Sequence, residues 1–364
     1  MSRLRVAVVG AGHLGRIHAR LLAALEEVEL VAVVDSLAAQ ARLVAEELGV
    51  EAFSDYRDLA ELADAAVIAT PTVTHHAVGL DLLEAGLHVF IEKPLAPTVL
   101  EAAALVAAAE HHGRVLQVGH VERFNPAFTA AAPLLDRPQY IEAERTSGYT
   151  FRSTDIGVVF DLMIHDIDLV LALAQSEVER IEALGISIFG RHEDIAQARL
   201  TFANGCVANL AASRASYAPG RTMRAFSSSA FASLDFAAPS ARVVRPSESL
   251  ASGAIDFDAL SAAEKQAVRE QLFTEHLRLE ELPLTPRNAI REELRDFAAS
   301  ISLNCRPQVD GRQALEAVAV AERVLDEIAA HRWNSESDIP CGPLAAFLAP
   351  QSVQSDPAPR RDAA

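Results

Sequence analysis

The chain has 364 residues, half of them hydrophobic, and its 50 acidic and 32 basic residues give a formal net charge of −18. This length suffices for two domains with separate cores, and an acidic surface repels nucleic acid, which excludes DNA and RNA as expected partners. Three scattered cysteines, an odd number without metal-ligand spacing, favour a reducing cytoplasm, and no apolar run reaches the roughly 18 residues of a membrane span.

The N-terminal segment 5–35 has the order strand, glycine turn, helix, strand, acid. An apolar run at 6–9 breaks into Gly10-Ala11-Gly12-His13-Leu14-Gly15, helical periodicity follows, and a second apolar run at 30–34 stops at Asp35. A dinucleotide-binding unit requires this order. We therefore predict a cofactor-binding turn here that includes His13 and Leu14.

Each residue type in the turn has a physical task. Gly10 permits the tight turn, Gly12 lets the backbone approach a pyrophosphate, and Gly15 lets the helix lie close to the sheet. The pyrophosphate would sit on the unpaired N–H groups at the helix N-terminus. Asp35 can accept hydrogen bonds from ribose hydroxyls and would repel a 2′-phosphate, which favours NAD over NADP; alternatively, it is an ordinary turn residue.

The rest of the first domain alternates short apolar strands with helices of 10 to 15 residues. Such alternation predicts a doubly wound parallel sheet that helices cover on both faces. We place this Rossmann domain at 1–120. The expected helices are 38–48, 77–85 and 98–111, and the expected strands are 65–70, 88–91 and 115–118.

Beyond residue 120 consecutive strands follow one another without helices between them, which predicts a mainly antiparallel sheet and an α+β domain at 121–332. An open face on such a sheet predicts self-association, at least as a dimer. The tail at 333–364 is expected to be poorly ordered. The expected strands are 139–146, 178–188, 196–202, 206–213, 221–227 and 231–236, and the expected helices are 285–302 and 310–331.

Two polar turns follow strands of the first domain at their carboxyl ends, where the ligand crevice of an open parallel sheet lies. Thr70-Pro71-Thr72, with His75 beyond, can line a cofactor, although a proline turn with a helix cap explains the threonines equally well. Glu92-Lys93-Pro94 offers an ammonium that can stabilise charge as a proton leaves, unless Lys93 is an ordinary solvated lysine. The histidine pairs 75–76 and 111–112 otherwise resemble surface residues near helix ends.

A polar stripe interrupts an apolar helix at 161–170. At helical spacing Asp161, His165 and Asp168 share one face, and burying them is costly unless they meet partners or a site. We interpret His165 as a general base that faces a cleft. Two alternatives stay open: a core histidine that Asp161 holds, and a metal site, which lacks the usual companion motifs and which we do not predict.

Five motifs, in this order and spacing, resemble those of the glucose–fructose oxidoreductase, inositol dehydrogenase and rhizopine catabolism (Gfo/Idh/MocA) superfamily. The similarity covers about 5–331. The motifs are GAGHLG at 10–15, Asp35, TPTVTH at 70–75, AGLHVFIEKPLA at 85–96 and the D-x-x-x-H pair of DLMIHD at 161–166.

This resemblance implies NAD(P)-dependent oxidation of a sugar or cyclitol hydroxyl, and a second domain whose open sheet forms a homodimer or homotetramer. It implies that Lys93 is the family's EKP lysine, Asp161 its companion acid and His165 the proton acceptor. It also implies a cis peptide between Lys93 and Pro94. Non-catalytic members tend to lose these polar positions, so their presence favours an enzyme.

Within the superfamily, the segments 119–126 and 155–166 look like the branch that oxidises UDP-N-acetylglucosamine at C3, which supplies diamino sugar for lipid A. A UDP-sugar needs cations for its diphosphate. Each arginine could instead be a solvated surface residue, and Tyr217-Ala218-Pro219-Gly220 stands where we expect more basic residues. The candidate arginines are Arg123, Arg145, Arg152, Arg214, Arg221 and Arg224.

The resulting hypothesis is a cytoplasmic NAD-dependent dehydrogenase. Its rivals are a dehydrogenase of a free sugar or inositol, and a non-catalytic protein loaded with NAD. The predicted cofactor residues are Gly10, Gly12, His13, Leu14, Gly15, Asp35, Thr70, Pro71, Thr72, His75, Glu92 and Lys93. The predicted substrate residues are Lys93, Glu122, Arg123, Asn125, Arg152, Asp161, His165 and Arg221.

Overall fold

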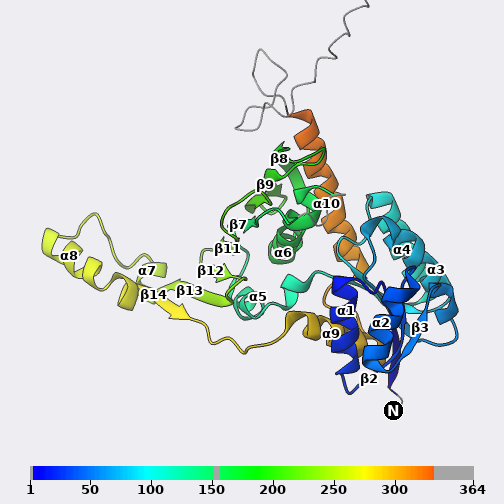
Figure 1. Cartoon of the computed structure of the whole chain (residues 1–364). Coiled ribbons are helices and arrows are strands. Elements are labelled where there is room, and N and C mark those ends of the chain that lie inside the picture. The colour runs from blue at the N-terminus through cyan, green and yellow to red at the C-terminus, as the bar shows by residue number, and fades with distance from the viewer. Residues whose placement is uncertain (1–2, 151–155, 332–364) are drawn as a thin grey trace, which may run out of the picture.

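A computed structural model describes residues 3–150 and 156–331 of the chain (Figure 1). The predicted tail at 333–364 lies outside these residues. No helix in the described ranges combines the length and apolarity that crossing a bilayer requires.

The first half builds a six-stranded parallel sheet in the order β3-β2-β1-β4-β5-β6. This order reverses direction between β1 and β4, where a doubly wound sheet opens its ligand crevice. β1 and β4 are apolar and almost wholly buried because helices cover both faces. The strands are β1 (Leu4–Val9), β2 (Val28–Val34), β3 (Glu51–Phe53), β4 (Ala65–Ile68), β5 (His88–Glu92) and β6 (Leu116–Gly119).

Four helices connect these strands: α1 (His13–Ala23), α2 (Ala38–Leu48), α3 (His75–Glu84) and α4 (Val99–His112). Helices α2 and α4 end at glycines in the left-handed region, Gly49 and Gly113, so their ends could be predicted closely. Strand β3 was not predicted, because three residues with no buried position give no pattern.

The second half forms an eight-stranded sheet in the order β14-β13-β12-β11-β7-β10-β9-β8. Among the described strands only β7 and β10 pair in parallel, which confirms a mainly antiparallel sheet. The strands are β7 (Tyr140–Thr146), β8 (Val178–Ile186), β9 (Ile195–Phe202), β10 (Val207–Ser213), β11 (Gly220–Phe226), β12 (Phe231–Asp235), β13 (Ser240–Pro246) and β14 (Leu277–Glu281).

Helices α6 (Ile164–Ala174) and α10 (Gly311–Ala330) cover one face of this sheet and leave the other open (Figure 1). Along β9, buried and more exposed side chains alternate, as one covered face requires. Strands β13 and β14 and the segment between them were not predicted. The shorter helical elements are η1 (Tyr56–Leu59), η2 (Thr72–Thr74), η3 (Val121–Phe124), α5 (Pro126–Ala131), η4 (Ala132–Leu134), η5 (Val159–Met163), α7 (Glu248–Ala251), α8 (Ala262–Glu270) and η6 (Leu272–His276).

Helix α9 (Ala289–Ser302) returns to the Rossmann domain, although a boundary at residue 120 assigns it to the second domain. Its Leu294, Phe297 and Ala298 share a hydrophobic core with β1, β4 and α1. The ring of Phe297 stands edge-on to Phe90 of β5, with 5.8 Å between centroids. A second core runs from the Rossmann sheet through α6 and α10 into the eight-stranded sheet. The two halves are therefore packed together.

The glycine turn has the geometry that a dinucleotide needs. Gly10 has a φ of +100°, and a Cβ there would lie 2.6 Å from the carbonyl oxygen of Ala69. A Cβ at Gly15 would lie 1.7 Å from the carbonyl oxygen of Gly10. At Gly12 nothing lies within 4 Å of the Cβ position, so the backbone is open to a ligand there.

We predict that Gly15→Ala destabilises the protein by about 1–3 kcal/mol or more, because the methyl group overlaps backbone that cannot yield. Gly12→Ala is the matched control, since its φ of −68° suits alanine and its surroundings are open; it should change stability by about 0.5 kcal/mol at most. Thermal and urea unfolding of both variants measures the difference. Equal stability of the two variants would contradict the account.

Candidate active site

Lys93 and Asp161 meet across the boundary between the two halves of the chain. Lys93 follows β5, and the peptide bond to Pro94 is cis, as predicted. Its Nζ donates to the backbone carbonyl of Asp161 at 2.7 Å and to Oδ1 of Asp161 at 3.3 Å. The two side chains are 16% and 23% exposed, so the pair is shielded yet still reachable from solvent.

Asp161 lies in the widened π-helical turn η5 directly before α6. The predicted stripe of three residues is therefore only partly correct. Asp168 is buried, and its Oδ1 lies 3.4 Å from Nη1 of Arg123. It therefore pairs with a different cation from Asp161, which contacts Lys93. The carboxylate of Asp161 contacts Lys93, so a core histidine that Asp161 holds is not what the structure contains. Asp166, which the spacing left out, is instead buried against Arg145.

His165 stands one turn after Asp161 on α6. Its pKa is lowered well below 6.5 because burial disfavours the charged ring and because the positive charges of Lys93, Arg145 and Arg221, and of His120 when protonated, repel a protonated imidazole. Among the described residues its Nδ1 is buried without a hydrogen-bond partner. The imidazole is therefore neutral near pH 7, which is the state that can accept a proton.

A buried ion-pair network supports this helix. Nη1 of Arg145 lies 2.7 Å from Glu122, and its Nε and Nη2 donate to both oxygens of Asp166 at 3.1 and 2.9 Å. Asn125 donates to Glu122 at 3.0 Å and caps α5 by accepting from the N–H of Ala127. Glu122 and Asn125, predicted to bind substrate, thus already have partners inside the protein.

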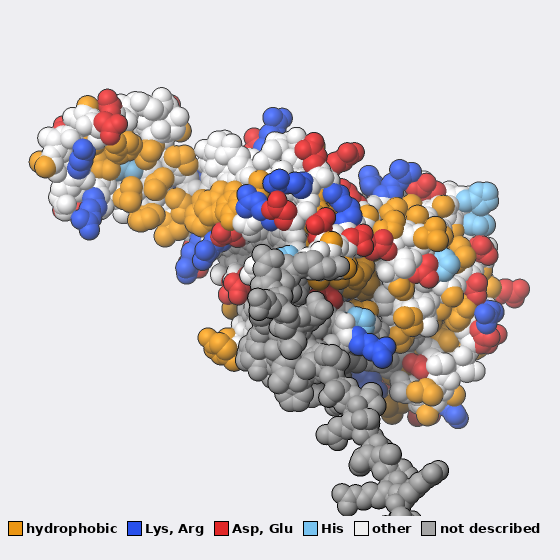
Figure 2. Space-filling view, turned by 90° about the horizontal axis from the view of Figure 1, so that it is seen from above, with side chains coloured by type: hydrophobic (Ala, Val, Ile, Leu, Met, Phe, Trp, Pro, Cys, Tyr) orange, Lys and Arg blue, Asp and Glu red, His pale blue; other side chains and the backbone are white. Residues whose placement is uncertain are grey.

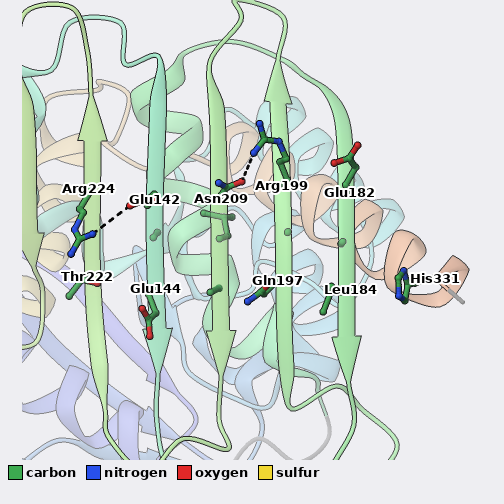
Figure 3. Close-up of a pocket in the computed structure, with 15 residues that line it drawn as sticks. Glu142, Glu144, Glu182, Leu184, Gln197, Arg199, Asn209, Thr222, Arg224 and His331 are labelled. Carbon is green, nitrogen blue, oxygen red and sulfur yellow. Dashed lines mark hydrogen bonds and ion pairs between the residues drawn. The ribbon is translucent and has the colours of Figure 1, made fainter. Parts of the chain in front are cut away.

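Most of the arginines expected to hold a diphosphate are used elsewhere. Arg123 is buried and pairs with Asp168 and the carbonyl of Gln308, and buried Arg214 pairs with Asp194. Arg224 lies on the open face of the sheet beside Glu142 (Figure 3). Arg152 lies outside the described residues. Arg221, 55% exposed and 3.8 Å from Glu122, is the described arginine that stays available beside His165.

The predicted cofactor residues lie around the glycine turn and the carboxyl end of the parallel sheet. Asp35 accepts from the backbone N–H groups of Ala11 and Leu37, both at 2.8 Å, so it joins the glycine turn to the end of β2. Each oxygen keeps capacity for a ribose hydroxyl. Gly12, His13 and Leu14 are exposed, and Thr70 accepts from the Thr74 hydroxyl at 2.8 Å. These residues fit a dinucleotide.

His75 is buried, so the expectation of a surface histidine was wrong at this position, whereas His111 and His112 are exposed. Its two ring nitrogens lie 2.8 Å from the carbonyl of Pro94 and 2.9 Å from that of Thr70. His75 therefore links the two polar turns that sequence reasoning treated separately.

Glu92 points inward to a cluster that the sequence did not reveal. Its carboxylate lies 2.6 Å from Nε2 of His18, and Glu293 of α9 lies beside it, buried and without a hydrogen-bond partner among the described residues. Burial and the nearby Glu92 raise the pKa of Glu293 well above its usual value. The helical spacing of His18 after the glycine turn was the available signal.

In the described ranges, the ligand atoms of His18, Glu92 and Glu293 all lie within 4.8 Å of one another, which is close enough for a candidate metal site. However, two ligands of one ion stand roughly 3 Å apart or more, whereas 2.6 Å between His18 and Glu92 is a hydrogen bond. The arrangement thus describes a hydrogen-bonded pair.

His120 is a second residue that sequence reasoning missed. It follows β6, is 1% exposed, and neither ring nitrogen has a partner among the described residues. Burial lowers its pKa. The nearby cations Arg123 and Lys93 lower it further, whereas the carboxylates of Asp168 and Glu92 raise it. Its position at the end of a parallel strand was the signal for a site residue.

A hollow on the open face of the eight-stranded sheet is separate from these residues (Figure 3). Its polar side chains project from β7 to β11, while α6, which carries His165, lies on the other face. They include Glu142, Glu144, Glu182, Gln197, Arg199, Asn209, Thr222 and Arg224.

Two family models match the chain. Residues 4–120 match an oxidoreductase family with an NAD-binding Rossmann fold, and residues 118–231 match the GFO/IDH/MocA C-terminal domain. The chain belongs to the Gfo/Idh/MocA oxidoreductase family. It is thus an oxidoreductase, and the resemblance in its motifs is confirmed.

Relatives within the Gfo/Idh/MocA family include proteins named as dehydrogenases of a nucleotide sugar and of a cyclitol. The chain is 43% identical over 237 residues to UDP-N-acetylglucosamine 3-dehydrogenase of Acidithiobacillus ferrooxidans, covering 65% of this chain and 75% of the relative. It is 31% identical over 233 residues to scyllo-inositol 2-dehydrogenase (NAD(+)) of Bacillus subtilis, covering 59% and 68%.

The solved structure of the Acidithiobacillus ferrooxidans enzyme has a TM-score of 0.79 and 35% identity, and the match covers 91% of this chain and 99% of that one. Levoglucosan dehydrogenase in complex with NADH and levoglucosan has a TM-score of 0.77 at 18% identity, covering 91% and 99%, and shares the fold.

We predict that the acid limb of kcat/KM lies below pH 6.5. A base must be neutral, and because the pKa of His165 is lowered, activity persists as pH falls until it reaches that lowered value. A pH–rate profile checks this, with circular dichroism at each pH to exclude unfolding. An acid limb at or above pH 6.5 would contradict the assignment, and His165→Asn should remove the activity.

Proposed function

We propose that this protein catalyses NAD-dependent oxidation of a sugar hydroxyl to a ketone, with C3 of UDP-N-acetylglucosamine as the site of reaction. The observation that carries the proposal is the convergence of Lys93, fixed by Asp161, with a neutral His165 from the other half of the chain. The 43% identical relative that bears this activity in its name supports the choice of sugar.

In the proposed mechanism His165 takes the hydroxyl proton as the carbon loses its hydride. Lys93 donates a hydrogen bond to the same oxygen and stabilises the negative charge that develops on it. Asp161 holds the ammonium in position, because its carbonyl and carboxylate both accept from Nζ. NAD, when bound, supplies the hydride acceptor, so the C–O bond becomes a carbonyl while two electrons leave with the hydride.

Arg221 is the residue that we propose for the diphosphate of a nucleotide sugar. Its side chain is 55% exposed, and its positive charge lowers the pKa of His165. A diphosphate can accept several hydrogen bonds from one guanidinium. Glu122, Arg123 and Asn125 would then not contact the sugar. They would stabilise the site from inside the protein, because Glu122 binds Arg145 and Asn125, and Arg123 binds Asp168.

The proposal includes a cytoplasmic dimer formed through the open face of the eight-stranded sheet. Side chains of both charges and amide side chains line a hollow on this face, including Glu142, Arg199, Asn209 and Arg224 (Figure 3). Opposite charges on one face can complement themselves across a two-fold axis.

The test is NAD reduction, followed as NADH absorbance, with UDP-N-acetylglucosamine, UDP-glucose, myo-inositol and glucose. We expect turnover with UDP-N-acetylglucosamine to exceed that with each of the other three compounds. Faster turnover of inositol or glucose would favour the rival dehydrogenase, and no NADH from any sugar would favour a non-catalytic role. Lys93→Met, which keeps the length of the side chain without the charge, should lower kcat about 100-fold or more while NAD still binds.

We also predict the cofactor preference. Asp35→Ser removes a negative charge at the ribose while a hydroxyl can still accept a backbone hydrogen bond, so kcat/KM with NADP should rise relative to NAD. The measurement is kcat/KM with each cofactor at saturating sugar. Asp81→Ser, which removes a half-buried acid of α3 that contacts Tyr56 and Arg57, is the control. A wild-type preference for NADP would overturn this part of the proposal.

A further inference from the structure

An arm, which we define as residues 244–281, reaches away from the rest of the molecule (Figure 1). It contains the end of β13, α7, α8, η6 and β14. From Val244 to Glu281 not one residue is buried. The arm therefore has no hydrophobic core within the single chain.

The arm nevertheless contains many large apolar residues, as is typical of a segment that another surface buries. Figure 2 shows hydrophobic side chains gathered along the arm. Phe257, Phe273 and Leu279 are 42%, 57% and 54% exposed. Ordering each residue costs about 1–2 kcal/mol of backbone entropy, which burial normally offsets. The large apolar residues between its two strands and in β14 are Leu250, Ile255, Phe257, Leu260, Val268, Leu272, Phe273, Leu277 and Leu279.

The last strand of the arm has an unused edge. β14 ends the eight-stranded sheet and pairs only with β13 among the described strands. Such an edge offers N–H and C=O groups to another strand. A strand that pairs with this edge must also match its side chains.

The charges on this edge are unbalanced within one chain. Arg278 lies directly opposite Arg245 in the β13–β14 pair, and like charges in that position are destabilising. Arg245 is compensated by Glu280 at 3.3 Å. Arg278 has no ion pair within 4.0 Å in the described part of the chain. An acid beside Arg278 would complete the arrangement.

We propose that β14 pairs antiparallel with β14 of a second copy of this chain, about a two-fold axis at Leu279. The strand reads Leu277-Arg278-Leu279-Glu280-Glu281. This register places each Arg278 opposite Glu280 of the partner subunit, and Leu279 opposite its own copy. A parallel in-register pair would instead set arginine against arginine. The charged residues beside Leu279 are thus complementary in the antiparallel orientation only, with Leu277 opposite Glu281 at the ends of the pairing.

This contact uses a different surface from the open face. The arm edge belongs to β14, whereas the polar hollow spans β7 to β11. Together with the proposed open-face dimer, this contact closes a tetramer with dihedral symmetry if the two two-fold axes intersect at right angles. The inference about the arm does not depend on the proposed catalytic function, because mass and activity are measured separately.

The test is the molar mass in solution of the full chain, by sedimentation or light scattering. Arg278→Glu should halve the mass of the wild-type assembly, because each acid then faces an acid. The double variant Arg278→Glu/Glu280→Arg should restore it, since the opposite charges meet again across the axis. Arg269→Glu, the same charge change on exposed α8, is the matched control. A monomeric wild type, an unchanged mass for Arg278→Glu, or no rescue by the double variant would overturn the proposal.

A cross-link provides a second measurement in case a charge variant folds poorly. Residues that face each other across an antiparallel pair have Cα atoms about 4.5–5.5 Å apart, within disulfide range. Leu279→Cys in a Cys305→Ser background, which removes the exposed cysteine of the described residues, should form a covalent dimer under mild oxidation. Leu303→Cys in the same background, a site away from the arm that is more exposed than Leu279 (74% against 54%), should not. Failure of the Leu279→Cys variant to cross-link would count against the register.

Discussion

The contact between Lys93 and Asp161 is the interaction on which the site depends, because it joins the end of a Rossmann strand to the helix that carries His165. A lysine on a flexible stem would otherwise sample many positions. Here Nζ is held by two acceptors at once, and the hydrophobic core that continues through both halves fixes the distance between the elements. Packing and electrostatics therefore support each other at this point.

The charges beneath the site show how that geometry is maintained. Arg145, Glu122 and Asp166 are almost fully buried, and ions removed from water are tolerated only where each finds a partner. Arg145 serves both carboxylates, so removing Arg145 would deprive two buried acids of the cation that they share. The network fixes the orientation of α6 relative to η3, and with it the position of His165.

Most of the Rossmann half, apart from β3 and the return of α9, could be predicted from the sequence, because its glycine turn, buried strands and glycine-ended helices are local patterns. The catalytic candidates could be placed for the same reason: each lies at the end of a strand or on a strongly apolar helix. The partners of Arg123 and Asn125 could not be predicted, because Asp168 and Phe236 come from distant parts of the sequence.

Other differences have equally physical causes. The π-helical turn at Asp161 changes the angular spacing, so a stripe at i, i+4 and i+7 loses Asp168. β14 was missed because its alternation of apolar and polar residues, Leu277 to Glu280, covers only four residues before Glu281 ends it. His75 looked like a surface residue because nothing local shows that two turns close over it.

Helix α9 has a consequence for motion. The chain passes between the two halves before α5, again before α9 and once more after it, so three covalent connections join them. A single flexible hinge would allow the halves to swing apart, whereas three tethers at separate places restrict rotation to small amplitudes. Entry of a bulky reactant and departure of its product must then rely on local rearrangement of short segments, with the body of the enzyme remaining nearly rigid through each turnover.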